Sequence, residues 1–308
     1  MKTFKTATLA IAFFAFTLLF TACSSDSPDN KRNVSEKANY PITITDSLGE
    51  DITIEEEPES IVTLAPNITE IVYALGLGDK VVGRNDYSDY PEEALDAEVV
   101  GDFATLDIER IVELDPDVVI ASTFFDEDMQ AKFQEVGIQV ITLYDSTSFD
   151  GVYTSIETLG KVFNVEDKAS DITEEIKEQI AEVEENVKEE EKPTVYYVVG
   201  FGQGGDYTAT GDTFINEMLT MAGGDNIAKD SAGWTYSKEL LIEKDPEIII
   251  LPEYFFEEFI SSEDYKELSA VKNNKVYTID ANLLERQGPR SGLGVKEIAA
   301  ILHPELFK

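Results

Sequence analysis

Residue types that commonly build catalytic or metal sites are scarce in this sequence. Its 308 residues include one cysteine, one histidine and one tryptophan. A single cysteine excludes an internal disulfide. A single histidine speaks against a bound zinc or manganese ion, because such sites usually use several histidines. The histidine, His303, lies in a Leu-His-Pro sequence near the C-terminus, where we expect a structural or surface role.

Positive charge is also scarce. The chain has 24 Lys and Arg residues against 62 Asp and Glu residues, a formal net charge of -38. Such a surface repels nucleic acid and anionic lipid headgroups, so we exclude DNA and RNA as partners. We find no Ser-His-Asp order and no phosphate-binding loop, and we predict no catalytic residues. A binding protein rather than an enzyme is expected, with a secreted carboxylate-dependent hydrolase as a remote alternative.

The N-terminal residues have the pattern of a targeting signal. A positively charged start and an apolar run, too short for a normal spanning helix, end at Phe-Thr-Ala before Cys23. This resembles a bacterial lipoprotein signal, although Phe20 stands where leucine is usual. We predict a signal peptide at residues 1–22, lipidation of Cys23 and a flexible tether at residues 23–39. The protein would then be anchored at the extracytoplasmic face of a bacterial membrane; a plain secretory signal and an uncleaved anchor are the alternatives.

A long acidic helix is predicted at residues 165–192. Five apolar residues recur at spacings of three and four, which places them on one helical face. They are Ile172, Ile176, Ile180, Val183 and Val187. Glu and Lys fill the other face, and Pro193 stops the helix.

The sequences on the two sides of this helix resemble each other. Three blocks recur in the same order, pairing residues 69–76 with 216–224, 111–120 with 241–250, and 140–143 with 276–279. Each side reads as helix, helix, short apolar strand, connection and strand, which suits a parallel sheet covered on both faces. We predict an α/β fold in which the helix joins two similar lobes with mostly parallel sheets, residues 40–164 and 193–308. A ligand cleft would lie between the lobes.

Three local features are also predicted. Alternating isoleucines within residues 42–54 indicate a β-hairpin. Asn67 and Glu70 have the spacing of a capping box, with Asn67 as the N-cap. Residues 200–205 match G-x-G-x-x-G, but residues 206–211 have the chemistry of loop or strand, so we expect a glycine-rich loop at the cleft and no dinucleotide site.

Several motifs together resemble one family. They are residues 61–70, 74–79, 115–117, 223–226, Tyr-Ser-Asp-Tyr-Pro at 87–91, Gly233-Trp234 and Arg-Gln-Gly-Pro-Arg at 286–290. Taken in chain order, they resemble the substrate-binding lipoproteins of ABC importers for iron complexes and vitamin B12, over residues 40–308. The resemblance implies two α/β lobes joined by one rigid helix, with the ligand in the cleft. It also implies that a monomer delivers its ligand to a dimeric permease with ATPase subunits.

The ligand implied by the resemblance is a ferric siderophore-type iron complex or a corrinoid, and no cofactor is expected. A cobalamin-specific or haem-specific protein of the same family is the alternative. Relatives that hold vitamin B12 tend to have tryptophans where Phe103 and Phe124 stand. Haem would need an axial tyrosine or methionine, whereas Met218 and Met221 resemble helix-core residues. Arg286 favours an anionic siderophore, because a planar guanidinium suits carboxylate or catecholate groups.

The family's functional residues can be carried over to matching positions. Glu70 and Glu217, at equivalent points of the two lobes, would bind arginines of the permease; the simpler reading is an acid in the first turn of a helix. The predicted ligand contacts are Pro66, Asn67, Arg84, Tyr87, Phe103, Phe124, Phe201, Trp234, Glu285 and Arg286. For the aromatic residues the alternative is core packing, and for the arginines it is compensation of an acidic surface. Arg290 is expected to be structural.

Overall fold

The computed structural model describes residues 40–144 and 147–307. The predicted signal peptide, lipidated cysteine and tether lie outside these residues. Within the described residues, no helix combines the length and the apolar character needed to cross a membrane.

The N-terminal half of the described chain forms a five-stranded parallel sheet with the order β5-β4-β3-β6-β7. Its strands are β3 (Ile61–Thr63), β4 (Val81–Arg84), β5 (Glu98–Val99), β6 (Val118–Ala121) and β7 (Val140–Thr142). Every residue of β6 is buried, because alternate side chains enter two different apolar clusters on the two faces of the sheet. The helices of this half are α1 (Pro66–Ala74), α2 (Ile108–Leu114), α3 (Glu127–Glu135) and α4 (Phe149–Val162).

Two local predictions for this half have different outcomes. The β-hairpin is confirmed: β1 (Ile42–Thr45) and β2 (Asp51–Ile54) pair antiparallel, with Ile42 opposite Ile54. The capping box is wrong. Helix α1 begins at Pro66, its N-cap is Ala65, and no side chain caps it. Proline is favoured at the first helical position, so Asn67 lies inside the helix and its Nδ2 instead donates to Ser122 Oγ at 3.2 Å.

The C-terminal half has a six-stranded sheet with the order β11-β9-β8-β12-β13, and β10 also pairs with β8. Its strands are β8 (Thr194–Gly200), β9 (Asp206–Thr208), β10 (Asp225–Asn226), β11 (Thr235–Tyr236), β12 (Ile248–Pro252) and β13 (Val276–Ile279). Pairs among β8, β10, β12 and β13 are parallel, whereas β9 pairs antiparallel with β8 and β11. The helices are α6 (Phe214–Met221), α7 (Lys238–Lys244), α8 (Phe256–Ser261), α9 (Ser269–Lys272), α10 (Asn282–Glu285) and α11 (Ser291–Leu302). The predicted α/β class with mostly parallel sheets is confirmed.

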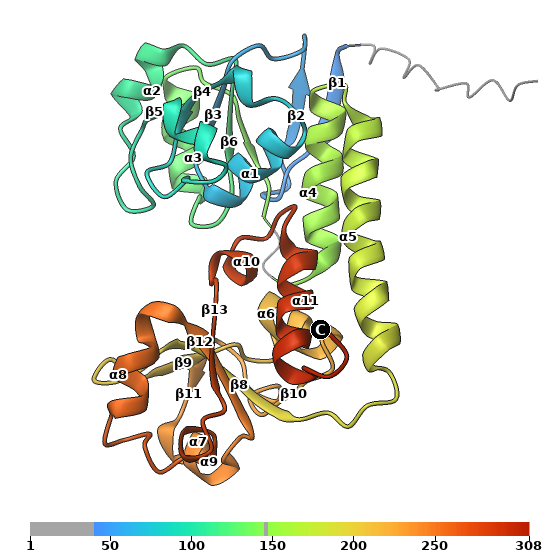
Figure 1. Cartoon of the computed structure of the whole chain (residues 1–308). Helices are drawn as coiled ribbons and strands as arrows, with labels where there is room; N and C mark the ends of the chain where they lie inside the picture. The colour runs from blue at the N-terminus through green and yellow to red at the C-terminus, as the bar shows by residue number, and fades with distance from the viewer. Residues whose placement is uncertain (1–39, 145–146, 308) are drawn as a thin grey trace, which may run out of the picture. The chain divides into compact units, whose positions relative to one another are not determined.

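Helix α5 (Glu166–Val187) runs between the two sheets in the sequence and packs on helices of both halves (Figure 1). It contacts α4 from the N-terminal half and α11 from the C-terminal half. All five residues of its predicted apolar face are buried. The helix ends at Val187 rather than near residue 192, because Val187 is the last residue of that face and residues 188–192 are all exposed.

The main apolar core is shared between the halves. One continuous cluster of buried residues includes Ile61 of β3, Ile176 of α5 and Ile250 of β12. Each sheet also has one smaller apolar cluster on its outer face, one in the N-terminal half and one in the C-terminal half. The helices α4, α5, α6 and α11 therefore pack both sheets into one core.

Candidate functional site

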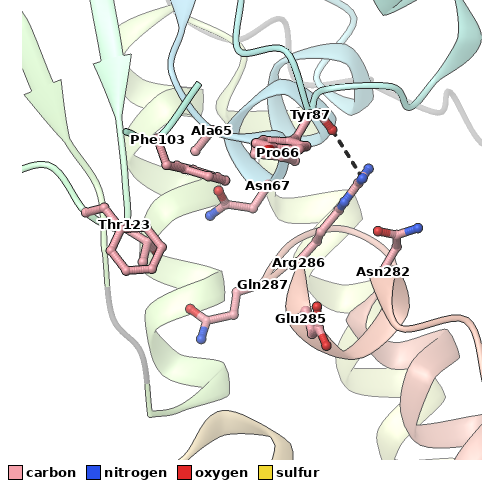
Figure 2. Close-up of a pocket in the computed structure, with 11 residues that line it drawn as sticks. Ala65, Pro66, Asn67, Tyr87, Phe103, Thr123, Asn282, Glu285, Arg286 and Gln287 are labelled. Atoms are coloured by element: carbon pink, nitrogen blue, oxygen red, sulfur yellow. Dashed lines mark hydrogen bonds between the residues drawn. The ribbon is translucent and has the colours of Figure 1, made fainter. Parts of the chain in front are cut away.

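A cavity of about 400 Å³ is lined by residues from both halves of the described chain (Figure 2). Its lining residues are Ala65, Pro66, Asn67, Tyr87, Phe103, Thr123, Phe124, Asn282, Glu285, Arg286 and Gln287. The first seven follow the carboxyl ends of β3, β4, β5 and β6. Loops at the carboxyl ends of parallel strands are where α/β proteins usually bind ligands. The remaining four belong to α10 and the residue pair after it.

One wall of the cavity consists of aromatic rings that are open to solvent. The rings of Tyr87 and Phe103 stack with centroids 5.7 Å apart, and Phe103 meets Phe124 edge-on at 5.5 Å. Phe124 remains 77% exposed and has a φ of 66°. A bulky residue with positive φ is strained, and such strain is often kept at functional sites. The wall offers a flat apolar face to a ligand.

The opposite side of the cavity is polar. It carries the amides of Asn282 and Gln287, while Asn67 adds an amide from α1 (Figure 2). Burial raises the pKa of the Glu285 carboxyl, and the Tyr197 hydroxyl, which donates to its Oε1 at 3.4 Å, acts in the opposite direction. This side therefore combines two neutral amides, which can both donate and accept hydrogen bonds, with the Glu285 carboxyl and the Arg286 guanidinium.

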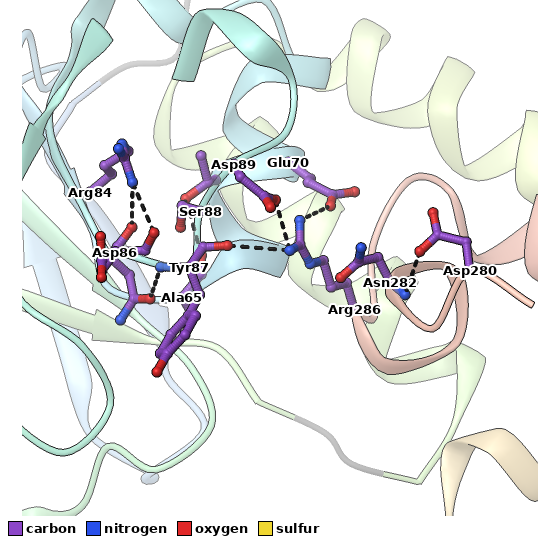
Figure 3. Close-up of polar contacts among 12 residues, drawn as sticks. Ala65, Glu70, Arg84, Asp86, Tyr87, Ser88, Asp89, Asp280, Asn282 and Arg286 are labelled. Atoms are coloured by element: carbon purple, nitrogen blue, oxygen red, sulfur yellow. Dashed lines mark hydrogen bonds and ion pairs between the residues drawn. The ribbon is translucent and has the colours of Figure 1, made fainter. Parts of the chain in front are cut away.

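The guanidinium of Arg286 is already bound by acceptors of the N-terminal half (Figure 3). Its Nη1 lies 3.1 Å from Glu70 Oε1, and its Nη2 lies 2.8 Å from Asp89 Oδ1. Nη2 also donates to the carbonyl oxygen of Tyr87 at 3.2 Å. Arg290 also pairs with Glu70, so two arginines face two carboxylates here and leave no uncompensated positive charge at this position.

Most of the predicted ligand contacts line this cavity. Seven of the ten predicted residues do so: Pro66, Asn67, Tyr87, Phe103, Phe124, Glu285 and Arg286. The cavity also contains residues that the sequence reasoning missed, namely Ala65, Thr123, Asn282 and Gln287. Each of these is small or neutral and lies within a few residues of a predicted contact. Their position beside those contacts was the signal that could have found them.

Three predicted contacts are not among the residues that line the cavity. Arg84 is 7% exposed and its Nη1 donates to the backbone carbonyls of Asn85 and Asp86 (Figure 3). Phe201 packs edge-on against Phe255, Phe259 and Tyr265, which is the core-packing alternative.

Trp234 is the third of these residues. It directly precedes β11 and is 39% exposed with a φ of 68°. The glycine-rich loop at residues 200–205 joins β8 directly to β9 and is also absent from the cavity lining. Strand β9 follows this loop, whereas a dinucleotide fingerprint opens a helix.

The two predicted docking glutamates are both engaged inside the molecule. Glu70 is 3% exposed and contacts Arg286 and Arg290, a burial that a docking role did not lead us to expect. Glu70 is buried because α1 pairs with the segment before α11, which supplies both arginines. Glu217 lies in the first turn of α6, and its Oε2 accepts a hydrogen bond from Phe149 N at 2.9 Å. Docking by either residue stays a prediction.

Comparisons with known proteins agree on one family. Residues 61–283 match the family described as periplasmic binding protein. An uncharacterized ABC transporter substrate-binding lipoprotein of Bacillus subtilis is 34% identical over 313 residues, which cover 99% of each chain. A cobalamin-binding protein of Halobacterium salinarum is 31% identical over 254 residues, covering 79% of this chain and 68% of that protein. The crystal structure of a periplasmic vitamin B12 binding protein of Vibrio cholerae has a TM-score of 0.70 and 28% identity, and the match covers 80% of this chain and 97% of that one.

Proposed function

This chain belongs to the periplasmic binding protein family, and on that premise we propose that it is the substrate-binding lipoprotein of an ABC importer. Its role is to capture a small metal complex outside the cell and deliver it to a permease, without catalysing a reaction. The observation that carries the proposal is the cavity lined by both halves, with stacked rings on one side and amides on the other. Such a cavity suits a flat, partly polar ligand.

The charge pattern of the cavity favours a corrinoid as the ligand. A corrinoid offers a flat macrocycle to the wall of Tyr87, Phe103 and Phe124, and its amide side chains match the amides of the opposite side. Arg286 is already paired with two carboxylates, so a highly anionic ligand would have to compete for it. The names of the cobalamin-binding and vitamin B12-binding relatives support the same choice.

A ferric siderophore-type complex is the second candidate. Arg286 lines the cavity, and a guanidinium released from Asp89 could bind carboxylate, hydroxamate or catecholate oxygens. The two candidates differ in salt dependence: binding of an anionic chelate weakens as ionic strength rises, whereas binding of a corrinoid by stacking and hydrogen bonds changes little.

Calorimetric titration of the purified protein tests the proposal. The ligand panel is cyanocobalamin, haem, and ferric hydroxamate, catecholate and citrate complexes. We expect saturable binding of cyanocobalamin, and about two- to tenfold weaker binding in Phe103→Ala, since an aromatic contact contributes about 0.5–1.5 kcal/mol. The matched control is Tyr277→Ala, because Tyr277 is 37% exposed, close to the 39% of Phe103, and lies outside the cavity. No binding by any compound, or equal losses in both variants, would contradict the proposal.

Delivery requires docking on a permease dimer, and here we propose Glu217 as a docking residue. Glu217 is half-buried, lies in the first turn of α6 on the C-terminal half and occupies the position that matches the docking glutamate of the family. Glu70 can take part only if a permease arginine replaces Arg286 or Arg290. Glu217→Gln is expected to keep ligand affinity and lower uptake into cells, with the exposed Glu92→Gln as control. Unchanged uptake would remove Glu217 from the docking surface.

Membrane attachment is proposed to depend on Cys23. Lipidation of this residue would keep the protein at the outer face of the membrane, where captured ligand stays near the permease. We expect Cys23→Ser to move the protein from the membrane fraction to the soluble fraction. Retention in the membrane fraction would instead favour an uncleaved anchor.

A further inference from the structure

Two arginines from one short segment of the C-terminal half reach a single glutamate of the N-terminal half. The segment at residues 286–290 joins α10 to α11. Arg290 Nε donates to Glu70 Oε2 at 2.8 Å, and Arg290 Nη2 donates to Glu70 Oε1 at 2.6 Å. Arg286 Nη1 donates to the same Oε1 at 3.1 Å. We call Glu70, Asp89, Arg286 and Arg290 the clasp.

The contact of Arg290 with Glu70 has the geometry of a bidentate ion pair. Two parallel donors of one guanidinium meet both oxygens of one carboxylate, the strongest form of charged hydrogen bond in proteins. The Glu70 side chain is 2% exposed and that of Arg290 is 16% exposed. The guanidinium also lies 4.0 Å from the ring centroid of Tyr90. Burial alone would lower the pKa of Arg290, but its hydrogen bonds and charge interaction with Glu70 outweigh this effect and raise the pKa.

The Arg286 contact is different because it reaches the cavity. Arg286 lines the cavity, and its Nη2 binds both the Asp89 carboxylate and the backbone carbonyl of Tyr87. The ring of Tyr87 forms part of the aromatic wall and stacks on Phe103. Figure 3 shows the guanidinium between Glu70, Asp89 and the Tyr87 carbonyl. One side chain of the C-terminal half thus holds the backbone of a wall residue in the N-terminal half.

We propose that Asp89 is a positioning residue of the ligand cavity. Together with Glu70 it directs Arg286 onto the Tyr87 carbonyl, so that the clasp fixes the aromatic wall relative to the polar side before a ligand arrives. The proposal rests on the proposed function in that the cavity is the ligand site. It also assigns Glu70 a role inside the molecule that is independent of docking.

The side chain of Asp89 is 60% exposed, so its own burial contributes little, and its effect must pass through Arg286. Asp89→Asn removes the charge that directs Nη2 and keeps the size of the side chain. Asp89→Glu restores a carboxylate within reach of the guanidinium. Arg286→Lys keeps the positive charge but cannot donate in two directions from a planar group, so it should not substitute for arginine.

Hydrogen exchange of the ligand-free protein gives the first test. In Asp89→Asn and Arg286→Lys we expect amides of residues 86–90 to exchange about tenfold faster, because one restraint on a local opening is lost. Asp89→Glu should return the exchange to the original rate. The control is Asp225→Asn, which removes an exposed pair with Lys229 far from the clasp in the sequence. Unchanged exchange in Asp89→Asn, or equal change in Asp89→Glu, overturns the proposal.

A titration with cyanocobalamin gives the second test. We expect about tenfold weaker binding in Asp89→Asn, a coupling of ordinary size, and recovery in Asp89→Glu. If no compound of the panel binds but the hydrogen exchange changes as expected, the proposed function is refuted and the role of the clasp is still supported. If the original protein, Asp89→Asn and Asp89→Glu all bind cyanocobalamin with equal affinity, the proposed function stands and a positioning role for Asp89 is refuted.

Discussion

Because the backbone conformation of Phe124 is unusual, we expect Phe124→Gly to be more stable than Phe124→Ala, which reverses the usual order of glycine and alanine. At most positions glycine is less stable than alanine by about 0.5–1 kcal/mol, because the unfolded chain gains freedom. Phe124 has a φ of 66°, where a residue with a Cβ is strained by about 1–2 kcal/mol and glycine is not. The difference between these terms makes Phe124→Gly more stable than Phe124→Ala by about 0.5–1 kcal/mol.

Both variants lose the same ring, so the comparison isolates the backbone. Phe124 is 77% exposed and meets Phe103 edge-on, so the loss of that contact costs each variant about 0.5–1.5 kcal/mol. The assay is equilibrium unfolding in urea. The dependence of the unfolding free energy on urea concentration should be the same for both variants. Tyr254, 70% exposed and with negative φ, provides the control, where alanine should be the more stable. If Phe124→Gly unfolds at lower urea than Phe124→Ala, the strain argument is refuted.

Two further predictions concern Glu285 and the shared core. Burial raises the pKa of Glu285, so its ionisation lowers stability as pH rises from the unfolded-state pKa through the folded-state value. Glu285→Gln should therefore be slightly more stable than the original protein at pH 7, with the advantage gone at low pH; the gain is small because Glu285 remains partly exposed and solvent screens its charge. Thermal unfolding across pH checks this. Ile176→Ala should cost about 2–5 kcal/mol in urea unfolding, because Ile176 is 1% exposed. The exposed Glu178→Ala should cost little, and similar losses would contradict the assignment of Ile176 to the core.

Periodic patterns predicted the elements of the fold well. The apolar spacing of α5 identified five of its seven buried residues and missed Ala169 and Thr173, and continuous apolar runs identified β6 and β12. These patterns report on local burial, which each segment encodes by itself. The start of α1 was assigned wrongly, because proline at its first position outweighed the capping pattern of Asn67.

The site was predicted less completely than the fold. Tyr87 and Arg286 were found through family motifs, whereas the pairing of Glu70 with Arg290 joins residues 220 positions apart and leaves no local pattern. Phe201 is not among the residues that line the cavity, and its sequence position could not show this, because an aromatic residue after a strand can serve a cavity or a core equally well. Which one it serves depends on neighbours such as Phe259, which only the folded chain brings together.

The continuous core has a consequence for how the protein unfolds. Helices α4, α5, α6 and α11 bury their apolar faces in one cluster that includes residues of both sheets. Neither half could lose its structure without exposing apolar surface that the other half also covers. The described chain should therefore melt as one cooperative unit, and relative motion of its halves should be confined to small displacements that keep this shared packing intact.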